Sequence, residues 1–99
     1  MLHIVNKSPT ERSTLASCLA HALPGHAVLL IEDAVYAATR GSAMAARLTA
    51  VLRDIKVYVL APDLEARAMT GALLEGVVPV DHRGFVDLVV GHPRIQSWL

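Results

Sequence analysis

The sequence lacks the features that several common functions need. Of its 99 residues one is cysteine and 4% are aromatic, and nine lysines and arginines balance nine aspartates and glutamates. A single cysteine excludes an internal disulfide, a CxxC dithiol cycle and a cysteine-based zinc site within the chain. A formal net charge of zero gives no electrostatic footprint for nucleic acid or anionic lipid. We therefore expect no direct nucleic-acid binding, and any redox or sulfur chemistry must involve a second molecule.

Long hydrophobic runs and cofactor motifs are also missing. No apolar segment reaches the ~18–20 residues that a membrane-spanning helix needs. The N-terminal apolar stretch stops at Asn6 and Lys7, before it could form a signal-peptide core. The sequence contains neither HExxH nor GxGxxG nor GxxxxGK[ST]. We therefore expect a cytoplasmic protein without a membrane anchor, bound metal or cofactor.

What the sequence has in excess is apolar side chains. They make up 54% of the residues, and the mean hydropathy is +0.45. Ordinary soluble domains contain roughly 45–50%, and a short chain has little interior in which to bury the surplus. We predict a single domain over residues 1–99 with an apolar surface for a protein partner, and self-association when the chain is isolated.

Strand and helix patterns alternate along the chain. The predicted strands are residues 2–5, 26–31, 55–60 and 77–80, and residues 94–99 form a fifth strand or a docked tail. The predicted helices begin near residues 9, 32, 43, 62 and 84. Ser8 to Glu11 reads as a capping box for the first helix, and Pro79 places the fourth strand near an edge. This order favours a doubly wound α/β fold with a mostly parallel sheet of about four to five strands and helices on both faces.

Cys18 has two interpretations. On a helical wheel it falls at the margin between an apolar stripe and a polar side, with His21 three residues further on. Free cysteine is among the most buried residue types, so core packing is favoured. The alternative is a catalytic persulfide carrier, in which a His21 imidazolium supports the Cys18 thiolate.

The ends of the predicted strands offer a third function, a flavodoxin-like module that binds a small ligand near Asn6, Asp33 and Asp63. Asp33, Asp63 and Asp81 stand where helix N-caps are expected, and capping is the favoured interpretation. The five histidines show no ligand spacing and are interpreted as scattered surface or capping residues.

Two segments are candidate interfaces with a partner. Val35 and Tyr36 lie in a predicted helix that is apolar nearly all round, so either it faces a partner or the sheet buries it completely. Trp98, near the C-terminus, either packs on its own core or anchors an interface.

Three stretches together resemble one family. They are Met1-Leu-His-Ile-Val-Asn-Lys-Ser-Pro9, Ile55-Lys-Val-Tyr-Val-Leu-Ala-Pro-Asp-Leu-Glu-Ala-Arg67, and Val80-Asp-His-Arg-Gly-Phe-Val-Asp-Leu88 with Ile95-Gln-Ser-Trp98. In this order, over nearly the whole chain, they resemble the DsrH/TusB family. The resemblance implies a DsrEFH-like α/β subunit of a sulfur-relay complex that handles persulfide sulfur.

The resemblance also implies partners. The DsrH/TusB-like chain is expected to join DsrE/TusD-like and DsrF/TusC-like subunits in a dimer of heterotrimers. Sulfur is passed toward 2-thiolation of the tRNA wobble uridine or into dissimilatory sulfur oxidation. The main acceptor cysteine is expected on the DsrE/TusD-like subunit, which gives this chain a structural or accessory role. Cys18 resembles the helix-one cysteine of DsrH-type members, and the alternative is that it carries persulfide itself.

Overall fold

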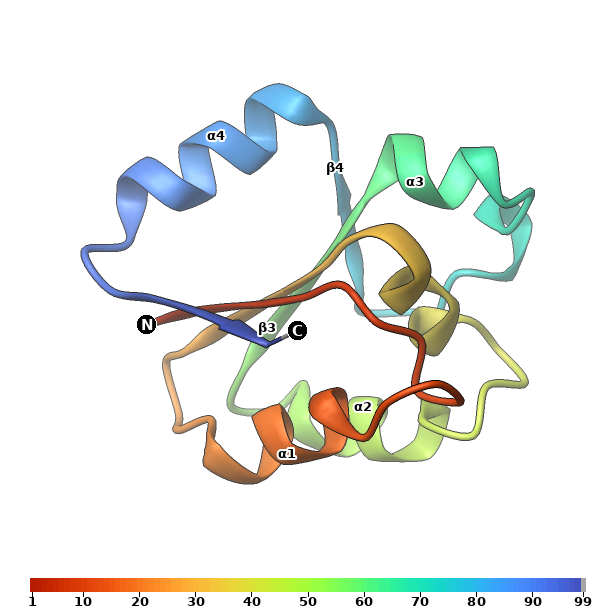
Figure 1. Ribbon diagram of the computed structural model, residues 1–99, viewed down its shortest axis with the longest axis horizontal. Helices are drawn as coiled ribbons and strands as arrows, with labels where there is room; N and C mark the ends of the chain where they lie inside the picture. Colours follow the sequence, from red (N-terminus) through yellow and green to blue (C-terminus); the bar gives the residue numbers. More distant parts are fainter. Residues whose placement is uncertain (99) are drawn as a thin grey trace.

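The sheet of the described chain has five parallel strands. The computed structural model describes residues 1–98, and the strand order is β4-β3-β2-β1-β5 (Figure 1). The strands are β1 (Leu2–Val5), β2 (Ala27–Leu30), β3 (Lys56–Leu60), β4 (Val78–Val80) and β5 (Ile95–Trp98). The predicted α/β fold class is confirmed. The segment after residue 94 is a strand, and the part of the prediction that concerns Leu99 lies outside the described residues.

Helical segments connect the strands. They are α1 (Thr14–His21), the 3-10 helix η1 (Glu32–Ala38), α2 (Ala45–Val51), α3 (Ala61–Ala66), the 3-10 helix η2 (Thr70–Ala72) and α4 (His82–Gly91). Successive strands β1 to β4 are neighbours, whereas α4 leads the chain back to the far side of β1, where β5 pairs. Within residues 1–98, none of these helices has the length and apolar character needed to cross a bilayer.

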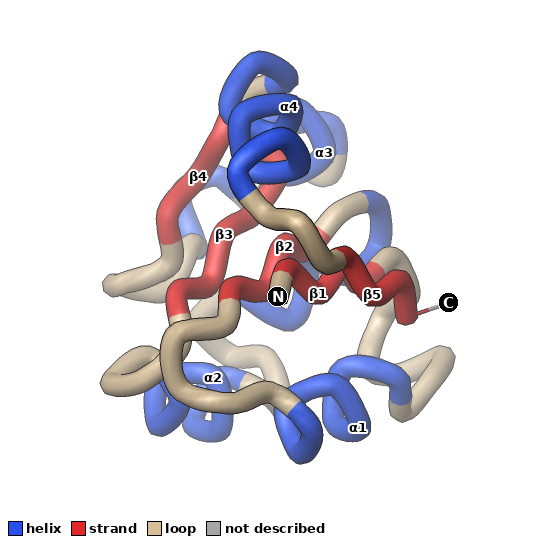
Figure 2. Tube along the Cα trace, turned by 90° about the vertical axis from the view of Figure 1, so that its left-hand side faces the viewer, coloured by secondary structure: helices blue, strands red, loops and turns tan. Residues whose placement is uncertain are grey.

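The strands present alternate side chains to two faces of the sheet. One face of the sheet is covered by α1 and α2 (Figure 2), and η1 contributes buried residues to the same core, so we call it the α1 face. Val5 belongs to this core, and His3 lies on the same face because side chains alternate along β1. The opposite face is covered by α4 (Figure 2), and we call it the α4 face. Leu2 and Ile4 belong to the core cluster of this face. Neighbouring strands in register continue this division, because Val5 pairs with Leu30 and Leu2 pairs with Ala27.

The α1 face holds the larger core. Its buried residues come from β1, β2, β3, the helical segments and the positions just before β3 and β4. They are Val5, Leu15, Cys18, Leu19, Val28, Leu30, Ala34, Val35, Ala37, Ala38, Leu48, Ile55, Val57, Val59, Leu64 and Val77. On the α4 face, the buried residues are Leu2, Ala27 and Leu29, against which half-buried side chains of α4 pack. Burial of apolar surface therefore stabilises mainly the α1 side of the fold.

The first helix begins later than predicted. Residues 8–12 form turns in which the Ser8 carbonyl accepts from the N–H groups of Glu11 and Arg12, both at 3.0 Å. The Ser8 hydroxyl oxygen accepts the Thr10 N–H at 3.3 Å and lies 2.9 Å from the Thr10 hydroxyl. Because Thr10 occupies the hydroxyl that a capping box would direct at Glu11, α1 starts at Thr14 and not near Pro9.

Candidate functional site

Cys18 lies on the buried side of α1. Its side chain is 0% exposed and belongs to the core of the α1 face. Burial raises the pKa of the Cys18 thiol to about 12, because a thiolate in the core would lose its hydration. Since the thiolate is the nucleophilic form, the folded chain holds this sulfur as a protonated and shielded thiol at neutral pH.

The buried stripe of α1 includes Cys18. Leu15, Cys18 and Leu19 are its buried residues, at the i, i+3, i+4 spacing of an apolar face. The sequence placed Cys18 at the margin of this stripe, and the structure places it inside. A wheel gives the order of residues around a helix, but it cannot give the width of the strip that the sheet covers.

His21 is directed away from this core. It is exposed, and its Nδ1 donates to the Ser17 carbonyl at 2.8 Å. Its ring centroid lies 5.7 Å from that of Trp98. Neither interaction involves Cys18. The described structure therefore shows no contact through which His21 would stabilise a Cys18 thiolate in the way that the sequence predicted.

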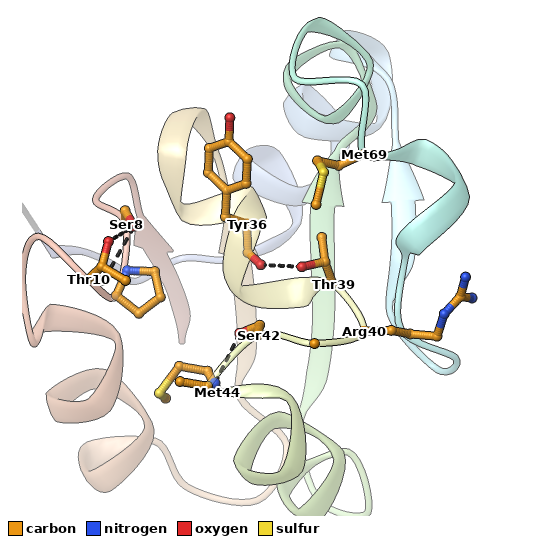
Figure 3. Close-up of a pocket in the computed structure, with 11 residues that line it drawn as sticks. Ser8, Thr10, Tyr36, Thr39, Arg40, Ser42, Met44 and Met69 are labelled. Atoms are coloured by element: carbon orange, nitrogen blue, oxygen red, sulfur yellow. Dashed lines mark hydrogen bonds between the residues drawn. The ribbon is translucent and has the colours of Figure 1, made fainter.

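A cavity of about 530 Å³ lies beyond the carboxyl ends of β1 and β2 (Figure 3). Parallel sheets of this kind commonly bind ligands at that position. Its walls come from the segment after β1, from η1 and the loop before α2, and from the loop between α3 and η2. The lining residues are Ser8, Pro9, Thr10, Tyr36, Thr39, Arg40, Gly41, Ser42, Ala43, Met44 and Met69.

Several polar side chains around this cavity have hydrogen-bond partners within the chain. The Thr39 hydroxyl donates to the Tyr36 carbonyl at 2.7 Å, and the Ser42 hydroxyl oxygen accepts the Met44 N–H at 2.9 Å (Figure 3). Arg40 extends away from the cavity, and its guanidinium donates to the Gly71 carbonyl at 2.7 Å. None of the described lining residues is Cys, His, Asp or Glu. The cavity therefore offers mainly apolar contact, and none of its described lining residues is suited to act as the general base that would activate a serine or threonine hydroxyl.

Two of the three strand-end aspartates do not cap their own helices. The Asp63 carboxylate accepts the N–H of Glu32 at 2.6 Å. Glu32 has a φ of 51°, a strained value for a residue with a side chain. Asp33 forms an ion pair with Arg67 at 2.9 Å, and Arg67 also donates to the Asp63 carbonyl at 3.1 Å. The capping prediction is therefore wrong for Asp33 and Asp63, which tie the end of β2 to α3.

Asp81 does cap its helix, as predicted. Its carboxylate accepts the Gly84 N–H at 2.7 Å at the start of α4. Asn6, the remaining strand-end residue, is half-buried, and its Oδ1 has no hydrogen-bond partner among the described residues.

A second cavity, of about 400 Å³, brings three histidines together beside β5. It is lined by Met1, His3, His21, Leu23, His26, Gln96 and Trp98. His3 is 2% exposed, and its Nε2 lies 3.0 Å from the Nδ1 of His26. The Trp98 indole N–H donates to the Nδ1 of His3 at 3.1 Å. His3, His21 and His26 are therefore gathered at one cavity and not scattered. The interpretation as a surface or capping residue is wrong for His3, which is buried, whereas His21 is exposed and bonds a helix carbonyl as expected.

The environment of His3 disfavours its charged form. Its pKa is lowered from the ordinary value of 6.5, first by burial and then by the nearby His26, the amino group of Met1 and His21. No group of three or more His, Cys, Asp or Glu side chains in residues 1–98 is placed to hold a metal ion. This cavity therefore combines apolar surface with a His3 ring that its surroundings favour in the neutral form.

The three candidate interface residues have different surroundings. Val35 is completely buried on the α1 face, so its side chain presents no surface to a partner. Tyr36 is 39% exposed and stands at the wall of the larger cavity. Trp98 is half-buried on β5 and packs toward His3 and His21. The structure thus leaves Tyr36 and Trp98 accessible to contact from outside.

Solved structures with the same fold are distant in sequence. The ychN protein from E. coli matches with a TM-score of 0.77 and 20% identity, covering 97% of each chain. A protein of unknown function from Methanobacterium thermoautotrophicum matches with a TM-score of 0.73 and 18% identity, over 97% of this chain and 95% of that one. At such low identity these similarities show the fold alone.

Sequence relatives are closer. The chain is 38% identical to "Protein TusB" from Shigella flexneri and 38% identical to "Protein TusB" from Pectobacterium parmentieri, in each case over 99% of this chain and 100% of the relative. A family described as "DsrH like protein" matches residues 7–95. The resemblance carried by the three sequence stretches is therefore confirmed, and the chain belongs to the DsrH family.

Proposed function

We propose that this chain is an accessory subunit of a heteromeric sulfur-relay complex and that it positions partner chains without carrying sulfur itself. The observation that carries the proposal is the full-length similarity to proteins named TusB, together with the DsrH family match. The three sequence stretches that resemble this family imply a subunit of an assembly that passes persulfide sulfur.

The accessory role rests on the position of Cys18. Persulfide transfer proceeds by attack of a thiolate on sulfur, so the acceptor must be both ionised and reachable. Cys18 is neither in the folded chain, because it is fully buried and its pKa is raised to about 12. The larger cavity contains no cysteine among its described lining residues. We therefore place the sulfur-carrying cysteine on a partner subunit.

The proposed partners are DsrE/TusD-like and DsrF/TusC-like chains, in a dimer of heterotrimers. Apolar side chains exposed on the α4 face support association. Val86 and Val90, one helical turn apart on α4, are 57% and 79% exposed. Val78 and Ile95, on the edge strands β4 and β5, are also exposed. They lie on the α4 face, because Tyr58 and Leu2, with which they pair in register, belong to the core cluster of that face. A neutral chain with such a surface is suited to apolar association.

We propose 2-thiolation of the tRNA wobble uridine as the end point, in preference to dissimilatory sulfur oxidation. The relatives found at full length carry the name TusB, which favours the thiolation branch. A strain that lacks this chain should lose 2-thiouridine from tRNA and regain it on complementation. An unchanged level of 2-thiouridine in the deletion strain would overturn the proposal that the relay ends at tRNA.

The complex is tested by purifying the tagged full-length chain from its native cells under mild conditions. We expect DsrE/TusD-like and DsrF/TusC-like chains to co-purify in constant ratio. Absence of both from the purified material would overturn the proposed complex.

The accessory role is tested on the same complex after incubation with a persulfidated donor protein. Intact-mass spectrometry should show the mass gain of one sulfur atom on a partner and none on this chain. A Cys18→Ala variant should support sulfur transfer as well as the parent does. A mass gain on this chain that vanishes in Cys18→Ala would instead make Cys18 a persulfide carrier.

A further inference from the structure

A chain of hydrogen bonds links the two ends of the described structure. It runs from the Trp98 indole on β5 to His3 on β1, and from His3 to His26 just before β2. His26 Nδ1 also accepts the backbone N–H of Leu23, at 3.2 Å. The chain therefore connects the edge strand β5, the strand beside it and the turn that follows α1.

Two groups in this network can only donate, and together they fix the proton positions. An indole N–H is a donor only, so the Nδ1 of His3 must carry a lone pair, and its proton lies on Nε2. The N–H of Leu23 is likewise a donor, so the Nδ1 of His26 carries a lone pair, which the Leu23 N–H and the Nε2–H of His3 share. Both rings are therefore neutral in this arrangement, each with its proton on Nε2.

His21 carries the opposite tautomer. Its Nδ1 lies 2.8 Å from the Ser17 carbonyl, which can only accept, so its proton is on Nδ1 when the ring is neutral. Three histidines around one cavity thus have assigned tautomers, and two of them depend on each other.

Adding one proton breaks this network. When His3 takes up a proton from solvent, the proton goes to its Nδ1, because its Nε2 already carries one. Nδ1 would then become a donor that faces the indole donor of Trp98, and that hydrogen bond would be lost. The Trp98 side chain is half-buried, so its freed N–H would need water or another partner.

The groups around His3 oppose its protonation from several elements. His26 faces it from the turn before β2, the amino group of Met1 from its own strand, and His21 from α1. From β5 it meets Trp98, which does not titrate, and is in register with Gln96, which does not titrate either. We propose that Trp98, His3 and His26 form an acid-sensitive latch that holds β5 against β1 while both imidazoles are neutral.

The direction of the pH effect follows from linkage. The pKa of His3 is lowered in the folded chain relative to its ordinary value of 6.5, so the unfolded chain binds the proton first on acidification. The stability contributed by the latch is therefore complete above about pH 6.5. It declines as the pH falls from there toward the lowered pKa of the folded state, where the latch opens.

The latch can be followed through one signal, because the chain contains a single tryptophan. In the ¹⁵N-labelled full chain at pH 8, ring-nitrogen NMR spectra should place the proton of His3 and His26 on Nε2 and that of His21 on Nδ1. Between pH 8 and pH 5 the indole N–H resonance should shift with a midpoint below 6.5, the same midpoint as the His3 ring.

Variants separate the latch from general acid effects. In His3→Asn, the side-chain oxygen can accept the indole N–H without titrating, so the transition of the indole resonance should disappear. His82→Gln is the matched control, since His82 is exposed at the start of α4, and it should retain the transition. If His3→Asn does not fold, Trp98→Phe serves instead, and its His3 midpoint should rise because the neutral ring loses a donor.

Three results would overturn the latch. They are a proton on Nδ1 of His3 at pH 8, an indole resonance that stays constant from pH 8 to pH 5, and an unchanged transition in His3→Asn. Where Trp98→Phe replaces His3→Asn, an unchanged His3 midpoint would overturn it in the same way.

Discussion

On the α1 face, residues of α1, η1, α2 and α3 pack on the strands and enclose a continuous core, whereas on the opposite face α4 lies over the sheet without a fully buried residue of its own. Phe85, Leu88 and Val89 of α4 pack against Leu2 and Leu29 but remain half-exposed. The two sides of one sheet therefore differ in how completely they are closed by this chain.

This difference locates the surplus of apolar residues that the composition revealed. Most apolar side chains on the α1 face, including Val35 and Cys18, are buried in its core, although Leu23 after α1 is exposed. On the α4 face no side chain of α4 is fully buried, and Val86 and Val90 are exposed to solvent. A chain that buries the core on one face of its sheet and exposes apolar side chains on the other has a surface suited to a protein partner. This arrangement is consistent with a subunit of a larger assembly.

The largest effect should come from a leucine removed on the closed face. Leu48→Ala on α2 deletes a completely buried side chain, and we expect a loss of about 2–5 kcal/mol in the free energy of unfolding. Leu88→Ala on α4 is the matched substitution on the α4 face. Because Leu88 is only half-buried, its loss should be about 1 kcal/mol. Urea unfolding of the isolated chain measures both.

Equal losses of unfolding free energy in the two leucine variants would contradict the difference between the two faces, since they would mean that α4 packs as tightly as α2. A measurement on the complex tests the α4 face further. In the assembled complex the cost of Leu88→Ala should grow relative to that in the isolated chain, because a partner over α4 would complete the burial of this side chain.

Much of the fold could be predicted because its signals are local. The apolar run at residues 55–60 became β3, and Pro79 marked β4 as an edge strand. The late start of α1 was missed because two local motifs compete for one hydroxyl. Ser8 can cap a helix toward Glu11 or close a turn with Thr10, and the sequence contains both options.

The candidate site was less accessible to sequence reasoning because its contacts are long-range. His3 and Trp98 are 95 residues apart in sequence, and they meet only because β5 returns to pair with β1. Their inward orientation follows from strand alternation once that pairing is known. The burial of Cys18 was open for a similar reason, since it depends on how broadly the sheet covers α1.

A smaller effect is expected from the helix caps of the two faces. Asp81→Ala removes the side chain that accepts the Gly84 N–H at the start of α4 and should cost about 1 kcal/mol. Ser13→Ala at the start of α1 is the control, because the Ser13 side chain makes no capping hydrogen bond. Its cost should stay within about 0.5 kcal/mol. Amide hydrogen exchange should show faster opening of α4 in Asp81→Ala alone, and equal opening of α1 in Ser13→Ala would contradict this assignment.

The smallest effect on stability, and the most informative about partners, should come from Val90→Ser. Val90 is exposed, so the isolated chain should unfold within about 0.5 kcal/mol of the parent. If a partner covers the α4 face, the same substitution places a hydroxyl in an apolar contact, and less partner should co-purify with the tagged chain. Ala20→Ser on the exposed side of α1 is the matched control and should leave recovery unchanged. If equal amounts of partner co-purify with the two variants, the partner does not contact Val90. Tyr36 and Trp98 would then be the side chains to test.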